Sequence, residues 1–66
     1  MEYVNIIQKA IIFMHKHYTE NLTVADIANH VYLSSSYFST VFRANTGYTV
    51  KDYFLKYRRY RATLEL

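Results

Sequence analysis

The fold is decided by residues 22–47, which read LTVADIANHVYLSSSYFSTVFRANTG. Thr23 stands before an apolar, helix-periodic run, and an acid, Asp26, follows three residues later. This arrangement is a variant of the capping box, in which a hydroxyl accepts a free backbone N–H at the start of a helix. Ser34 is a second good N-cap. The stretch therefore predicts two consecutive helices, each opened by a hydroxyl side chain.

These two helices are expected over residues 24–30 and 35–45, with Gly47 just past the end of the second as a left-handed C-terminal residue. The link between them has only about four residues, which is typical of a helix-turn-helix whose second helix enters the DNA major groove. Ala28 is small where the two helices must approach each other closely. Tyr32 stands at a turn position where many such motifs carry glycine, so we expect it to adopt a positive φ at some energetic cost.

Two further helices are expected on either side of this pair, over residues 2–18 and 50–66. Both carry apolar side chains at spacings of three and four, and Thr49 repeats the capping logic of Thr23. The residues that form the apolar stripes of the four helices are Tyr3, Ile6, Ile7, Ala10, Met14, Tyr18, Ile27, Ala28, Val31, Phe38, Val41, Phe42, Val50, Tyr53, Phe54, Tyr57, Tyr60 or Arg61, and Leu64. The predicted fold class is all-α: one domain over residues 1–66, a small four-helix unit containing a helix-turn-helix of the homeodomain-like kind.

Composition supports a small folded domain and excludes several classes of protein. The chain has 66 residues, 52% hydrophobic and 18% aromatic, which disordered chains rarely reach. It has no cysteine, so disulfides and thiolate metal sites are excluded, and an intracellular, cytoplasmic setting is favoured. No apolar run is long enough for a membrane span, and the first residues do not resemble a signal peptide. The net charge of +3 permits a nucleic-acid partner.

The solvent-facing side of helix 35–45 is the most informative surface. Ser35, Ser36, Ser39 and Thr40 lie opposite its apolar stripe, together with Arg43. Such short side chains weaken a helix, and a merely solvated helix more often carries Glu and Lys. Short hydroxyls also let a helix lie deep in a groove and bond base edges or phosphates. A Ser-rich solvated face remains the simple alternative, but the short preceding turn favours contact with DNA.

Residues 22–62 resemble the first helix-turn-helix of the AraC/XylS class of bacterial transcription regulators. The elements that carry the resemblance, in order and spacing, are Leu22-Thr23, Ile27-Ala28, Leu33-Ser34, Tyr37-Phe38-Ser39, Phe42-Arg43, Thr46-Gly47, Tyr53, Arg58 and Ala62. The resemblance implies a DNA-binding domain of two such motifs joined by a linker helix. Helix 50–66 is similar to that linker, and its apolar stripe continues to the last residue, so we expect it to pack on a missing second motif or in a homodimer.

The resemblance also implies the site residues. Base-facing positions fall on Ser35, Ser36, Ser39 and Thr40, where many relatives carry longer side chains, so strong two-pronged base contacts are not expected. Arg43 would then contact a phosphate, and further phosphate contacts are implied around Thr23. Tyr37 borders the same face and is expected to stack or hydrogen-bond at the DNA backbone. The expected partner is double-stranded DNA, with no cofactor, metal, membrane or small molecule bound by these residues.

Other candidate functions have weaker support. The basic residues between Lys51 and Arg61 form either a second phosphate-contact surface or the solvated outer side of a helix. His15, His17 and His30 lack metal-ligand spacing, and neither the serines nor the scattered acids suggest catalysis. The alternative to DNA binding is a helical interaction or dimerisation module that has kept the fold.

Overall fold

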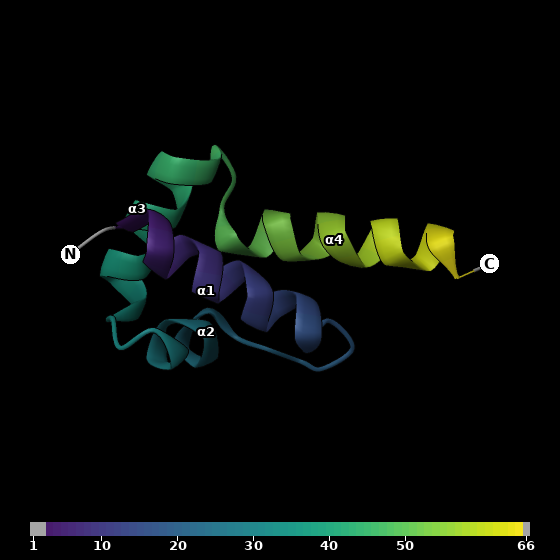
Figure 1. The fold of residues 1–66 in the computed structure, drawn as a ribbon, viewed down its shortest axis with the longest axis horizontal. Helices are drawn as coiled ribbons and strands as arrows, with labels where there is room; N and C mark the ends of the chain where they lie inside the picture. Colours follow the sequence, from purple (N-terminus) through teal and green to yellow (C-terminus); the bar gives the residue numbers. More distant parts are fainter. Residues whose placement is uncertain (1–2, 66) are drawn as a thin grey trace.

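The computed structural model describes the backbone of residues 3–65 and the side chains of residues 5–65. Four α-helices follow one another: α1 (Tyr3–Lys16), α2 (Val24–His30), α3 (Ser35–Thr46) and α4 (Val50–Leu64). The first three pack on one another, whereas α4 starts against α3 and projects beyond the others (Figure 1). Residues 3–65 contain no strand, so the all-α prediction is confirmed. Within the same range, no helix is long and apolar enough to cross a membrane.

The structure contains the four helices that the sequence predicted and differs from the prediction only at some of their ends. The expectation that the first helix runs to Tyr18 was wrong by two residues, because α1 ends at Lys16. Beyond it the chain turns, and the main-chain carbonyls of Tyr18 and Glu20 accept hydrogen bonds from the Arg58 side chain. α3 extends one residue further than expected, to Thr46. α4 ends at Leu64, before the expected residue 66, because Glu65 is its C-cap, and the expected start at residue 2 lies outside the described residues.

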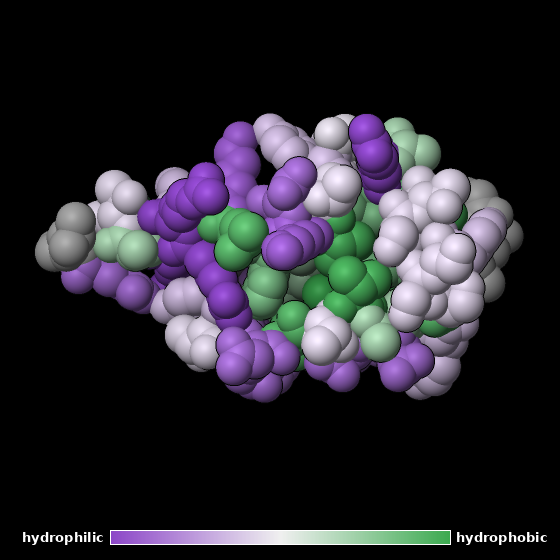
Figure 2. All heavy atoms as spheres, turned by 180° about the vertical axis from the view of Figure 1, so that it is seen from behind, coloured by the Kyte–Doolittle hydropathy of each residue, from purple (hydrophilic) through white to green (hydrophobic). Residues whose placement is uncertain are grey.

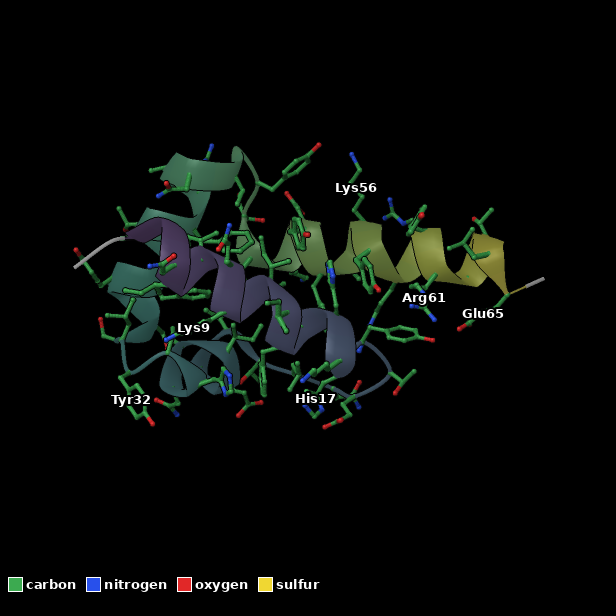
Figure 3. All side chains as sticks on the ribbon, viewed as in Figure 1. Lys9, His17, Tyr32, Lys56, Arg61 and Glu65 are labelled. Atoms are coloured by element: carbon green, nitrogen blue, oxygen red, sulfur yellow. The ribbon has the colours of Figure 1, made fainter. Side chains whose placement is uncertain are left out.

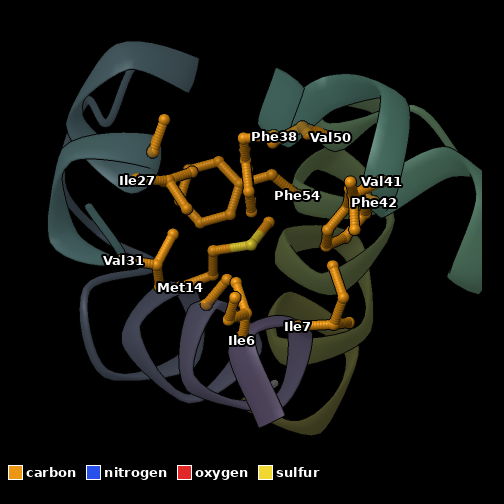
Figure 4. Packing of buried hydrophobic residues seen from close by; sticks show 12 residues of the cluster. Ile6, Ile7, Met14, Ile27, Val31, Phe38, Val41, Phe42, Val50 and Phe54 are labelled. Atoms are coloured by element: carbon orange, nitrogen blue, oxygen red, sulfur yellow. The ribbon is translucent and has the colours of Figure 1, made fainter. Parts of the chain in front are cut away.

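The core is made where the four apolar stripes meet (Figure 4). The buried residues are Ile6, Ile7, Ala10, Met14, Ile27, Ala28, Val31, Phe38, Val41, Phe42, Val50 and Phe54, all of them expected. Phe38 and Phe42 are fully buried with ring centroids 5.6 Å apart, and they anchor α3. Tyr18 and Tyr53 pack against the core at its edge. Leu64, at the end of the apolar stripe of α4, is 61% exposed because α4 extends beyond the other three helices there.

Hydroxyl caps define the starts of three helices, as the sequence indicated. Thr23 accepts the N–H of Asp26 at 3.1 Å and donates its own N–H to the Asp26 carboxylate at 3.0 Å, which completes the capping box. Ser34 and Thr49 accept backbone N–H groups in the same way, at 3.2 and 3.1 Å. Each bond satisfies a donor that has no partner within its own helix.

The turn between α2 and α3 is a Schellman motif with a tyrosine at its left-handed position. The N–H of Leu33 donates to the carbonyl of Ala28 at 3.0 Å, and the N–H of Tyr32 donates to that of Asn29 at 3.1 Å. Tyr32 has φ 61°, as expected, in a conformation that glycine adopts without strain. Its side chain is 94% exposed and points away from the helices (Figure 3). Tyr32 therefore gains no packing for the strain it carries.

Candidate nucleic-acid interface

The turn and the core together fix how α3 is presented. Ala28 is buried, and its carbonyl accepts the N–H of Leu33 immediately before the Ser34 cap. The Phe38 and Phe42 side chains are fully buried on the inner side of α3. Because one side of the helix is held in the core, the opposite side is left facing solvent.

The hydroxyl face of α3 consists of Ser35, Ser36, Ser39 and Thr40, and the structure brings all four together. Ser35 and Ser39 are one turn apart on one row, and Ser36 and Thr40 on the next. All are exposed except Ser39, which is half-buried. The Thr40 hydroxyl donates to the carbonyl of Ser36 at 3.1 Å and keeps its oxygen as an acceptor. The result is a shallow strip of hydroxyl groups without a charged side chain.

Arg43 extends this face towards the start of α4. It is exposed, in the last turn of α3, and its side chain has no partner among the described residues. A hollow of about 390 Å³ lies beside it, lined by Val24, Ser39, Thr40, Arg43, Thr49 and Val50. Ser35 and Ser36 lie one turn further back and outside this hollow. The guanidinium thus stands at the end of the hydroxyl face, as a phosphate-contacting group would.

Thr23 and Tyr37 lie near this surface with their main chains already in use. The N–H and the hydroxyl oxygen of Thr23 are both engaged with Asp26, so only its hydroxyl proton is left to donate. The Asp26 carboxylate next to it would also repel a phosphate. The N–H of Tyr37 donates to the Ser34 cap, and the Tyr37 side chain is 43% exposed. Of the three residues Thr23, Tyr37 and Arg43, only Arg43 has a positively charged side chain.

Two arginines of the basic stretch of α4 make contacts within the molecule. Arg58 donates to the carbonyls of Tyr18 and Glu20, and its guanidinium lies over the Phe54 ring, 4.5 Å from the centroid. Arg61 lies over the Tyr18 ring at 4.7 Å and is 3.4 Å from the carboxylate of Glu65 (Figure 3). These two arginines join α4 to the chain that follows α1.

The third engaged cation of this stretch is Lys56, whose ammonium donates to the hydroxyl of Tyr48 at 2.9 Å (Figure 3). The sequence contains a signal for contacts between arginines and aromatic rings on α4. Phe54–Arg58 and Tyr57–Arg61 are pairs four residues apart, which lie on the same side of a helix. Lys51 and Arg59 are the exposed cations of the stretch without a side-chain partner among the described residues.

His15 of α1 belongs to an aromatic cluster where α1 contacts α4, and we call this contact the seam between α1 and α4. Its ring stacks on Tyr57 with centroids 3.8 Å apart, and its Nε2 is 3.1 Å from the hydroxyl of Tyr53. Burial, and then the positive charge of Arg61, lower the pKa of His15 below its usual 6.5. His17 pairs with Glu20, and His30 stacks on Phe13 at 4.0 Å. The described residues include no group of three or more His, Cys, Asp or Glu that would hold a metal ion.

Three features define a helix-turn-helix unit of the DNA-binding type. They are the short Schellman turn, the small buried Ala28 where α2 meets α3, and an α3 that has one side exposed and no acidic residue. The chain belongs to the AraC family: the sequence profile described as "Bacterial regulatory helix-turn-helix proteins, AraC family" matches residues 14–55. The Msm operon regulatory protein of Streptococcus mutans serotype c (strain ATCC 700610 / UA159) is 40% identical over 60 residues. That match covers 91% of this chain but only 20% of the regulator. No solved structure matches the chain significantly.

Proposed function

We propose that the chain binds double-stranded DNA sequence-specifically, as part of a bacterial transcription regulator, with α3 in the major groove. The observation that carries the proposal is the hydroxyl face with Arg43 at its end, presented by a helix without an acidic residue. Family membership and the name of the Streptococcus mutans relative support it. The chain spans about a fifth of that relative's length. We therefore also propose, rather than infer from the match, that the chain belongs to a protein that regulates transcription in the cytoplasm.

In this proposal, Ser35, Ser36, Ser39 and Thr40 face the base edges, while Arg43 and, to a lesser degree, the Tyr37 and Thr23 hydroxyls contact phosphates. Hydroxyls either donate or accept, so they distinguish bases less sharply than a two-pronged arginine does. We therefore expect α3 to contribute much of its specificity through fit to the shape of the groove. The chain has no proposed catalytic role.

A salt titration of duplex binding tests the proposal. Fluorescence anisotropy of the 66-residue chain with a pool of random duplexes should show affinity that falls as salt rises, because phosphate neutralisation releases counterions. Arg43→Gln should weaken binding to all sequences alike and reduce the slope of log K against log salt by about 1. Lys9→Gln makes the same charge change on α1 and serves as the matched control, with circular dichroism confirming both folds. Absence of duplex binding by the wild-type chain at low salt would contradict the proposal.

The second candidate function is association through α4, with a second copy or with a second helix-turn-helix unit. Tyr60 and Leu64 are 58% and 61% exposed on the projecting part of this helix. Sedimentation equilibrium distinguishes the two functions. If association is the function, the chain should dimerise, lose dimerisation on Leu64→Asp and show no duplex binding.

A further inference from the structure

Two hollows beside the hydroxyl face share a common wall. The first, of about 390 Å³, contains Ser39, Thr40 and Arg43. The second, of about 260 Å³, runs along α4 past Lys51 and Leu55. Val24 of α2 and Val50 of α4 line both. The two hollows therefore adjoin, one against α3 and the other along α4, and we call the pair the Val24–Val50 groove.

The lining of this groove combines apolar side chains with one accessible cation in each hollow. Ile27 and Phe54 lie under the second hollow and are nearly fully buried, while Val24 is half-buried. Apolar surface open to solvent is visible in the middle of the face drawn in Figure 2, between pale and strongly hydrophilic side chains. Arg43 lines the first hollow and Lys51 the second. Each hollow therefore combines apolar lining residues with a positive group.

The charged side chains that line the groove are all basic, which favours an anionic occupant. None of the described residues that line the two hollows is acidic. Asp26 and Asp52, the nearest acids in the sequence, stand at the third positions of α2 and α4. Arg58 also lines the second hollow, but its guanidinium is held by the carbonyls of Tyr18 and Glu20. Among the described residues that line the groove, Arg43 and Lys51 are thus the two cations whose side chains have no partner.

We propose that the Val24–Val50 groove seats the sugar–phosphate backbone of the duplex whose bases face α3, with Lys51 as a further phosphate contact. A DNA strand presents apolar deoxyribose edges between regularly spaced phosphates, and two adjoining apolar hollows that each carry a cation match this alternation. The groove continues directly from the hydroxyl face, so both surfaces meet one ligand. This inference rests on the proposed function and extends the interface from the helix-turn-helix onto α4.

Replacing Lys51 with glutamine tests the inference. Because each phosphate contact contributes about 0.9 to the slope of log K against log salt, losing one should weaken duplex binding about tenfold at about 0.1 M salt. The loss should be the same for all sequences, and the slope should decrease by about 1. Arg59→Gln is the matched control: it removes one positive charge from the same helix but lies outside both hollows. It should retain nearly wild-type binding.

The outcomes separate this inference from the function on which it rests. If Arg43→Gln weakens binding and Lys51→Gln does not, the groove inference is overturned while DNA binding by α3 stands. Equal losses for Lys51→Gln and Arg59→Gln would show a general charge effect and also overturn it. Polyglutamate serves as a second probe. If Lys51→Gln weakened binding of polyglutamate but left duplex binding unchanged, the groove would be assigned to an acidic peptide and the inference would be overturned. Failure of the wild-type chain to bind any duplex would refute the proposed function itself.

Discussion

The guanidinium Nε of Arg58 donates a hydrogen bond to the main-chain carbonyl of Tyr18 at 2.7 Å, joining α4 to the chain just beyond α1. The same guanidinium also donates to the carbonyl of Glu20 and lies over the ring of Phe54. Three separate groups are thereby held by one side chain. Since Tyr18 and Glu20 lie beyond α1, the two carbonyl bonds help hold α4 in its direction relative to α1.

Replacement of Arg58 by alanine is expected to destabilise the fold by about 2 kcal/mol, because two carbonyls lose a charged hydrogen-bond donor. Arg58→Lys should recover only part of this loss, since an ammonium cannot reproduce the flat fork of donors. The measurement is urea unfolding followed by circular dichroism. Arg59→Ala is the control on the solvent side of the helix and should change stability by less than about 0.5 kcal/mol. Equal effects at both positions would disprove the structural role of Arg58.

Tyr32 offers a stabilising substitution. A left-handed backbone costs an ordinary residue about 1–2 kcal/mol, and asparagine tolerates it better. Because the Tyr32 side chain is 94% exposed, little packing is lost when it is replaced. Tyr32→Asn should therefore raise the free energy of unfolding by up to about 1 kcal/mol, whereas the β-branched Tyr32→Val should lower it. Thermal and urea melts of the pair check the expectation, and the reverse order would show that φ strain is not what matters here.

Gly47 shows the same backbone requirement at the end of α3. It has φ 79°, and its N–H donates to the carbonyl of Arg43 at 2.9 Å. An added Cβ would meet no atom within 4 Å, so any cost of Gly47→Ala comes from the backbone alone. We expect a loss of about 1 kcal/mol in urea unfolding, with a smaller loss for Gly47→Asn. An alanine variant as stable as the wild type would contradict this account.

The parts of the fold that the sequence predicted correctly are those determined locally. Helical periodicity identified the buried core residues, and short-range chemistry identified the caps at Thr23, Ser34 and Thr49. The strained turn at Tyr32 was also expected, because its position relative to both helices fixes φ. Each of these features depends on residues within about one or two helical turns of one another.

The features that the sequence did not predict depend on contacts between distant residues. Arg58 and Tyr18 are 40 residues apart, and their hydrogen bond helps explain why the first helix stops short of its apolar stripe. His15 and Tyr53 are 38 residues apart. In the candidate site, the hydroxyl face follows from α3 alone. The Val24–Val50 groove requires knowing how α2 and α4 meet, which no local pattern specifies.

His15 should make stability depend on pH just below neutrality. Burial, and secondarily Arg61, lower the pKa of His15 below 6.5, so the folded state stays neutral where the unfolded chain takes up a proton. The unfolded state then binds more protons, and stability must fall as pH drops below about 6.5. The slope attributable to one group cannot exceed about 1.4 kcal/mol per pH unit. Urea unfolding between about pH 7.5 and 5.5 measures it, above the range in which carboxylates ordinarily titrate.

The variant that tests the origin of this decline is His15→Phe, which keeps a flat ring against Tyr57 but does not titrate. Its stability should change less over this pH interval than that of the wild type, although the loss of the contact with the Tyr53 hydroxyl lowers its value at neutral pH. His30→Gln removes a histidine of α2 that stacks on Phe13 and leaves His15 in place, so this variant should retain the loss of stability at low pH. If His30→Gln abolished the decline and His15→Phe preserved it, the seam between α1 and α4 would not be the pH-sensitive part of the molecule.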